Sequence, residues 1–195
     1  MTSWMEVREN STFQNLCKFI GERIGQNPIC IETGCVYVDT TDNRPHGSTF
    51  NIVDYIAAPN NGILYSYDNR QSSFDAAIKG LDNNSVYFRP VLGDSVEQLR
   101  TNYNNYKSRN IKFAFLDSVE GDEEHMLNEF KIIEPYLSED AIVLLDDVLN
   151  PSSVKWKKTV PYVRSNVQFW DIIPTGGGVI GCFVGFYNKN KYGLN

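Results

Sequence analysis

Apolar positions along the chain follow two spacings that alternate from end to end. In residues 11–24 they recur every three or four positions, which predicts a helix, and Gly25 follows as a stop. Short apolar runs bounded by polar turn residues predict strands, and helical spacing follows each of the first five. The predicted strands are 28–31, 62–67, 86–92, 111–116, 141–145, 167–173 and 179–186.

The helices between these strands carry their own start signals. A helix follows Ser48, and the pairs Ser72–Asp75 and Ser95–Gln98 have the form of capping boxes. Further on, apolar spacing from Met126 to Leu137 predicts another helix, and a later helix-like stretch is interrupted by Pro161. Strand–helix alternation of this kind indicates a parallel sheet with helices on both faces.

The last two predicted strands are joined by residues 174–178, which are too few for a crossover helix, so we expect them to be antiparallel neighbours. The predicted fold is therefore α/β: a doubly wound, seven-stranded, mostly parallel sheet with a C-terminal antiparallel hairpin. We expect one domain over 1–195. It comprises an N-terminal helical extension (1–25), a core (26–187) and an insertion loop (35–46).

Composition narrows the set of partners. The chain has 195 residues, 24 acidic against 18 basic, and a net charge of −6. Nucleic acid is therefore not expected as a partner, because its binding rests on cationic groups that neutralise phosphates. No apolar run is long enough to span a membrane, and no secretory signal is visible. The four cysteines form no CxxC pair and favour a reduced, cytoplasmic protein.

Acidic residues stand where the predicted strands end. Glu32, Asp68, Asp117 and Asp146 close four of the first five strands, and Asp94 lies just beyond the other. In doubly wound sheets ligands bind at this edge, and an acid after the second strand can accept hydrogen bonds from ribose hydroxyls. No GxGxxG or Walker motif is present, which disfavours a nucleotide-dependent oxidoreductase. An acidic cleft suits a positively charged cofactor.

These motifs resemble those of class I S-adenosylmethionine-dependent methyltransferases. The resemblance rests on Glu32-Thr33-Gly34, Asp68, Gly93-Asp94-Ser95 and Asp117 after their strands, and on the terminal hairpin. Phe115-Leu116-Asp117 and Leu144-Leu145-Asp146-Asp147 are similar to the catechol and caffeoyl-CoA O-methyltransferases, and the segment from His46 is similar to macrocin-type enzymes.

The resemblance implies roles for individual residues. S-adenosylmethionine would be the cofactor. Its predicted binding residues are Glu32, Gly34, Ser48, Thr49, Asp68, Asp94, Ser95 and Asp117. A divalent ion, Mg²⁺ or Ca²⁺, would be held by Asp117, Asp146 and Asp147, since oxygen donors suit these ions.

Two departures from the family affect catalysis. Residues 35–46 form an insertion after the first turn, and Glu120 stands where catechol-type enzymes have a lysine base. The catalytic candidates are therefore Asp117, Glu120 and His46. His125 follows an acidic run and is expected to be a solvated helix residue.

The function expected from these residues is methylation of a small molecule, at a hydroxyl of a sugar, polyketide or phenol, with a divalent metal as an assisting ion. An alternative is a methyltransferase-like module that binds a nucleoside without catalysis. The sequence leaves a homo-oligomer open.

Overall fold

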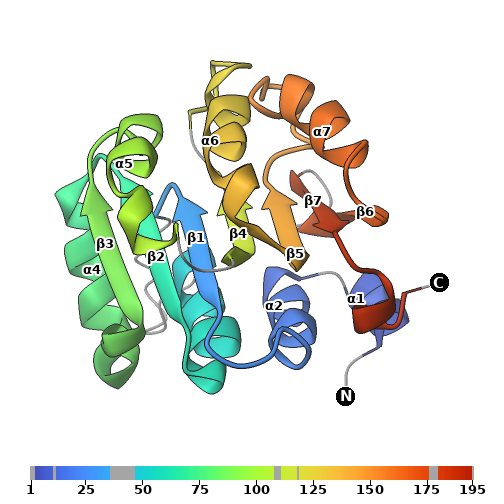
Figure 1. The fold of residues 1–195 in the computed structure, drawn as a ribbon, viewed down its shortest axis with the longest axis horizontal. Helices are drawn as coiled ribbons and strands as arrows, with labels where there is room; N and C mark the ends of the chain where they lie inside the picture. Colours follow the sequence, from blue (N-terminus) through green and yellow to red (C-terminus); the bar gives the residue numbers. More distant parts are fainter. Residues whose placement is uncertain are drawn as a thin grey trace.

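The computed structural model describes residues 3–10, 12–35, 47–107, 111–117, 119–175 and 180–194. Its centre is one seven-stranded sheet with the order β3-β2-β1-β4-β5-β7-β6 (Figure 1). The strands are β1 (Ile29–Thr33), β2 (Ile63–Asp68), β3 (Phe88–Leu92), β4 (Ile111–Leu116), β5 (Leu137–Leu145), β6 (Phe169–Thr175) and β7 (Ile180–Phe186). The first five are parallel, and β7 lies antiparallel to both β5 and β6. The predicted doubly wound sheet with its terminal hairpin is confirmed.

Helices cover both faces of this sheet, each over its own apolar cluster (Figure 1). One face carries α1 (Trp4–Glu9), α2 (Phe13–Gly21), α3 (Ser48–Ile52) and α4 (Gln71–Leu81). The other carries α5 (Ser95–Thr101), α6 (His125–Ile133) and α7 (Trp156–Arg164). The central strands β1 and β4 and the second half of β5 are buried almost throughout, as cover by two helical layers requires, whereas edge strand β3 is mostly exposed.

The N-terminal extension contains one helix more than the apolar spacing indicates. Helix α1 begins with a capping box in which Ser3 and Glu6 satisfy each other's backbone N–H groups. Its Trp4 ring packs edge-on against Phe19 of α2 and Phe186 of β7, with centroids 5.1 and 5.3 Å apart. The extension is thereby part of the core on this face.

The capping boxes predicted at Ser72 and Ser95 are wrong. Helix α4 begins at Gln71 with no side-chain cap. At α5 the cap is Asp94, which accepts a hydrogen bond from the Glu97 N–H at 2.9 Å. Ser95 is then free to use its hydroxyl elsewhere, and it does so in the site described below.

Several details of the elements also differ from the prediction. Helix α6 ends at Ile133, because Glu134-Pro135-Tyr136 form a 3-10 turn, and Leu137 already belongs to β5. Strand β3 begins at Phe88 after a 3-10 turn. Helix α7 runs through Pro161 without a break. None of the helices in the described ranges is long and apolar enough to cross a membrane.

Candidate functional site

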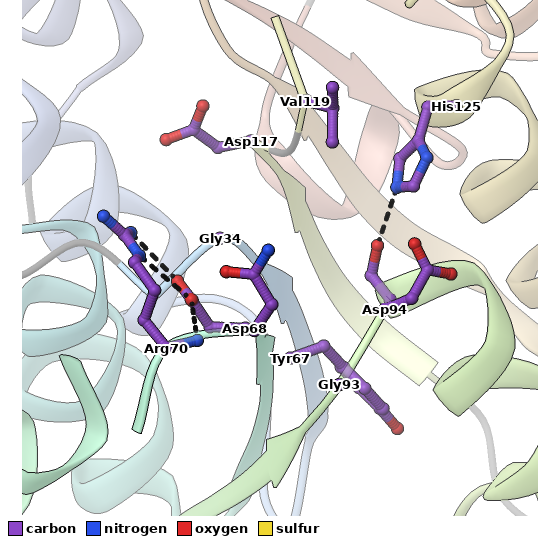
Figure 2. Close-up of a pocket in the computed structure, with 11 residues that line it drawn as sticks. Gly34, Tyr67, Asp68, Arg70, Gly93, Asp94, Asp117, Val119 and His125 are labelled. Carbon is purple, nitrogen blue, oxygen red and sulfur yellow. Dashed lines mark hydrogen bonds and ion pairs between the residues drawn. The ribbon is translucent and has the colours of Figure 1, made fainter. Parts of the chain in front are cut away.

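A pocket of about 200 Å³ opens where the first four parallel strands end (Figure 2). Sheet order reverses between β1 and β4, the point at which such folds bind ligands. The lining comes from the turns after β1, β2, β3 and β4 and from the start of α6. It consists of Gly34, Tyr67, Asp68, Asn69, Arg70, Gly93, Asp94, Ser95, Asp117, Val119 and His125.

Gly34 brings the turn after β1 against the turn after β4. Its φ is +80°, and a Cβ at this position would lie 1.9 Å from the carbonyl oxygen of Asp117. Its N–H donates to the Tyr67 carbonyl at 2.8 Å, which continues the ladder beyond the strand ends. Only glycine fits both the positive φ and the close approach.

Glu32 of β1 is fully buried and is not among the residues that line the pocket. Three hydroxyls donate to its carboxylate: Ser48 at 2.7 Å, Thr49 at 2.8 Å and Ser66 at 2.6 Å. Burial nevertheless raises the pKa of Glu32 to about 7, because the three donors only partly offset the loss of water. Ser48 and Thr49 are predicted to bind the cofactor, but in this structure their hydroxyls donate to Glu32.

Replacement of Glu32 by glutamine is expected to change how stability depends on pH. A carboxyl whose pKa is raised by folding is more easily protonated in the folded state, so stability falls as pH rises from about 4.5 to about 7. Glu32→Gln removes this charge, and it should make the protein more stable than wild type by about 2–3 kcal/mol at pH 8 but not at pH 4.5. Urea unfolding at both pH values measures the difference. The same change at exposed Glu97 is the control, and a pH-independent effect of Glu32→Gln would contradict the assignment.

Asp68 ends β2 and is closed off by Arg70 (Figure 2). The guanidinium donates to both carboxylate oxygens, with Nε to Oδ1 at 3.2 Å and a terminal nitrogen to Oδ2 at 3.1 Å. The Arg70 N–H adds a third bond at 2.7 Å. The Asp68 side chain is only 4 % exposed, whereas that of Arg70 is 64 % exposed, so Arg70 has room to move away.

His125 lies across the pocket from Arg70 (Figure 2). Ser95 also lines the pocket and contacts His125. The Ser95 hydroxyl and His125 Nε2 are 2.9 Å apart, and Ser95 also donates to buried Glu129. Thr33 donates to the other oxygen of Glu129 at 3.2 Å. A hydrogen bond to Glu129 raises the pKa of His125.

This grouping does not have the geometry of a hydrolytic triad. Glu129 approaches the same His125 nitrogen that faces Ser95, at 3.3 Å, instead of orienting the ring from the other nitrogen. The expectation that His125 is solvated is wrong, because its side chain is 13 % exposed.

A second group of charges lies beyond Asp117. The ammonium of Lys155 is fully buried and reaches Asp117 at 2.5 Å, Glu120 at 2.7 Å and Asp147 at 2.8 Å. Asp146 lies beside them, and burial, followed by repulsion from Asp117 and Asp147, raises its pKa. Oxygens of Asp117, Asp146 and Asp147 all fall within 4.8 Å of one another.

The structure thus divides the predicted site residues into groups. Gly34, Asp68, Asp94, Ser95 and Asp117 line the pocket. Glu32, Ser48 and Thr49 contact one another and are not part of the lining. Asp117, Glu120 and Asp147 meet at Lys155, with Asp146 next to them. His46 and residues 36–45 of the predicted insertion lie outside the described residues.

Sequence reasoning missed Lys155, Arg70 and Glu129. Lys155 precedes Lys157 and Lys158, and such a run is typical of a solvated helix face. Glu129 follows His125 at one helical turn, which is a signal for contact between the two side chains but not for burial.

Comparison with known proteins identifies the fold. No protein-family model matches the chain, and no curated protein matches it by sequence. One similar solved structure is the O-methyltransferase TomG from Streptomyces achromogenes, which is involved in tomaymycin synthesis and is bound to S-adenosylmethionine. Its TM-score is 0.67 at 14 % identity, and the match covers 89 % of this chain and 78 % of that one. An O-methyltransferase from Bacillus cereus, bound to S-adenosylhomocysteine, has a TM-score of 0.65 and 12 % identity, covering 95 % and 82 %.

An rRNA methylase from Streptococcus thermophilus is also similar, with a TM-score of 0.57 and 12 % identity, covering 88 % of this chain and 93 % of that one. The similar structures thus include enzymes with different acceptors, and at these identities the likeness establishes the fold alone. The resemblance seen in the sequence is confirmed at that level: the chain has the fold of the class I S-adenosylmethionine-dependent methyltransferases.

Proposed function

We propose that this protein is an S-adenosylmethionine-dependent methyltransferase. The observation that carries the proposal is the pocket at the ends of β1 to β4, in which Asp68 stands where a ribose-binding acid is expected in this fold. The cofactor, when bound, supplies a methyl group on a positively charged sulfonium. The lining carries three acids, Asp68, Asp94 and Asp117, against one arginine, Arg70, and this excess of negative charge favours a cation in the pocket.

The pocket residues suit different parts of that cofactor. Asp68 would accept from the ribose hydroxyls once Arg70 has moved aside, and Asp94 and Ser95 would lie toward the adenine. Gly34 lets the backbone approach the ligand without a side chain in the way. Buried Glu32 would support the turn through Ser48 and Thr49 and favour the ammonium of the methionine part electrostatically.

The acceptor is proposed to be a small molecule with a hydroxyl group. Acidic charge over the chain supports this choice over a nucleic acid, since phosphates would be repelled. Methyl transfer depends chiefly on holding the acceptor oxygen in line with the sulfonium methyl group. Asp117 lies at the edge of the pocket, and Glu120 is joined to it through Lys155, so both are candidates to act on the acceptor side.

Calorimetric titration tests the cofactor directly. S-adenosylmethionine and S-adenosylhomocysteine are expected to bind at micromolar concentration, and NAD is not. Binding of NAD alone would support an oxidoreductase instead. Cofactor binding without methyl transfer to any phenol, sugar or polyketide hydroxyl would favour the catalytically inactive nucleoside-binding module.

Asp68→Ala is expected to weaken S-adenosylmethionine binding by about 1–3 kcal/mol, or roughly 5- to 150-fold, because two ribose hydroxyls would lose a charged acceptor. Titration calorimetry measures the change. An affinity equal to that of wild type would show that the ribose lies elsewhere.

Arg70→Ala is the matched control for the Asp68 variant. Arg70 occupies the Asp68 oxygens and carries the same charge sign as the sulfonium. Its removal should therefore strengthen binding, by roughly 2- to 5-fold, the scale of an exposed ion pair. A general disturbance of the turn would weaken cofactor binding in both variants. Weaker binding by Asp68→Ala together with stronger binding by Arg70→Ala would therefore show that Asp68 is the acceptor.

A further inference from the structure

Lys155 is a buried lysine at the start of α7, where a lysine is not expected. Its side chain has no exposed surface. A positive charge at a helix N-terminus is also opposed by the backbone dipole. Both costs require compensation, and it comes from the carboxylates of Asp117, Glu120 and Asp147 within 2.8 Å.

Three carboxylates surround the ammonium. Asp117 and Glu120 accept hydrogen bonds from it at 2.5 and 2.7 Å, and an oxygen of Asp147 lies 2.8 Å away as an ion pair. A lysine ammonium can only donate, so these acids are the partners that its charge requires. Burial opposes the charge, but Asp117 and the other two acids more than offset it and hold the pKa of Lys155 above its usual value. Lys155 is thus a fixed cation and not a proton acceptor.

This cation stands where the family resemblance would place a metal. Asp117 and Asp147 belong to the predicted metal set, and both bind Lys155 instead. A divalent ion contacting their oxygens would lie about 2.0–2.6 Å from them and so close against the buried ammonium, and the two positive charges would repel each other. The residues as arranged therefore do not fit a divalent metal.

The backbone at Asp147 supports the same conclusion. Its φ is +60°, a left-handed conformation that costs a non-glycine residue stability. In this conformation an Asp147 oxygen lies 2.8 Å from the Lys155 ammonium, and the N–H of Val148 donates to the Gly181 carbonyl at 2.8 Å. The unfavourable backbone conformation thus occurs at one of the three acids that surround the Lys155 ammonium.

We infer that the ammonium of Lys155 takes the place of the divalent cation in this protein, which therefore neither binds nor needs a metal at Asp117, Asp146 and Asp147. The statement that the reaction needs no metal rests on the proposed methyltransferase function. The statement that no metal binds does not, because it follows from the charges around Lys155.

Metal binding without cofactor or acceptor tests the inference separately from activity. Mn²⁺ titrated into the protein and followed by the EPR signal of the free ion should show no stoichiometric binding to wild type. Lys155→Ala leaves the four acids without their cation, and it should bind one Mn²⁺ at least tenfold more tightly than wild type. In the same background Asp147→Asn should abolish the gain.

Lys158→Ala is the matched control, because it removes an exposed lysine of the same helix that pairs with Glu124. Its Mn²⁺ affinity should equal that of wild type. Stoichiometric Mn²⁺ binding by wild type that Asp147→Asn removes would overturn the inference, whether or not the lysine variant folds. Failure of folded Lys155→Ala to bind Mn²⁺ would also overturn it. Neither result bears on whether S-adenosylmethionine binds, which calorimetry decides.

Discussion

Gly34→Ala is expected to destabilise the folded protein by about 3–5 kcal/mol, the largest effect of a single methyl group in the pocket. A left-handed conformation costs a residue other than glycine about 1–3 kcal/mol, and forced overpacking adds about 1–3 kcal/mol. Here the new methyl group would meet the Asp117 carbonyl oxygen at 1.9 Å, and backbone cannot yield as a flexible side chain can. Thermal and urea unfolding measure the loss.

Two other glycines separate the causes of this effect. Gly193 also has a positive φ, +67°, but among the described residues no atom beyond its chain neighbours lies within 4 Å of the place that a Cβ would take. Gly193→Ala should therefore show the conformational cost alone. Gly121 has equally open surroundings in the described part of the chain and no positive φ, so Gly121→Ala should be nearly neutral. Equal losses for Gly34→Ala and Gly193→Ala would contradict the close approach of the two turns.

Lys155→Met is expected to cost about 3–5 kcal/mol, because removal of one partner leaves buried carboxylates uncompensated. The loss should be smaller at pH 5 than at pH 8, since protonation of those acids removes their mutual repulsion. The control Lys158→Met removes an exposed ion pair and should cost at most about 1 kcal/mol.

A double variant tests whether charge is the cause. Adding Asp147→Asn to Lys155→Met removes one of the uncompensated charges. The double variant should therefore lose less stability than the sum of the losses of the two single variants. Strict additivity would mean that Lys155 stabilises the fold through packing of its stem and not through its ammonium.

The sheet could be predicted because its strands are short apolar runs separated by clear turn and helix signals. The edge at which the site lies followed from the acids that end those strands. Helix α1 was missed because six residues with one buried side chain, Val7, carry too little periodicity. Pro161 predicts a break because it lacks an N–H, yet α7 continues through it, since the fixed φ of proline is compatible with a helix.

The fine structure of the site could not be predicted, because it depends on contacts between distant segments. Lys155 lies 38 residues from Asp117 in sequence, and nothing local marks it as buried. Asp68 was expected to be free for a ligand, but a neighbour two residues away, Arg70, satisfies it. Acids at strand ends identify where a site lies, whereas their partners decide what each acid can do.

The place of β7 has a consequence for how the chain folds during synthesis. Strand β7 lies between β5 and β6, so β6 has no neighbour in the sheet until β7 has been made. Trp4 and Arg8 bind Asp171 of β6, and the Trp4–Asp171 contact spans 167 positions of the sequence. During synthesis helix α1 must therefore wait for β6, and the nascent chain exposes an unfinished apolar face until about residue 186 has emerged.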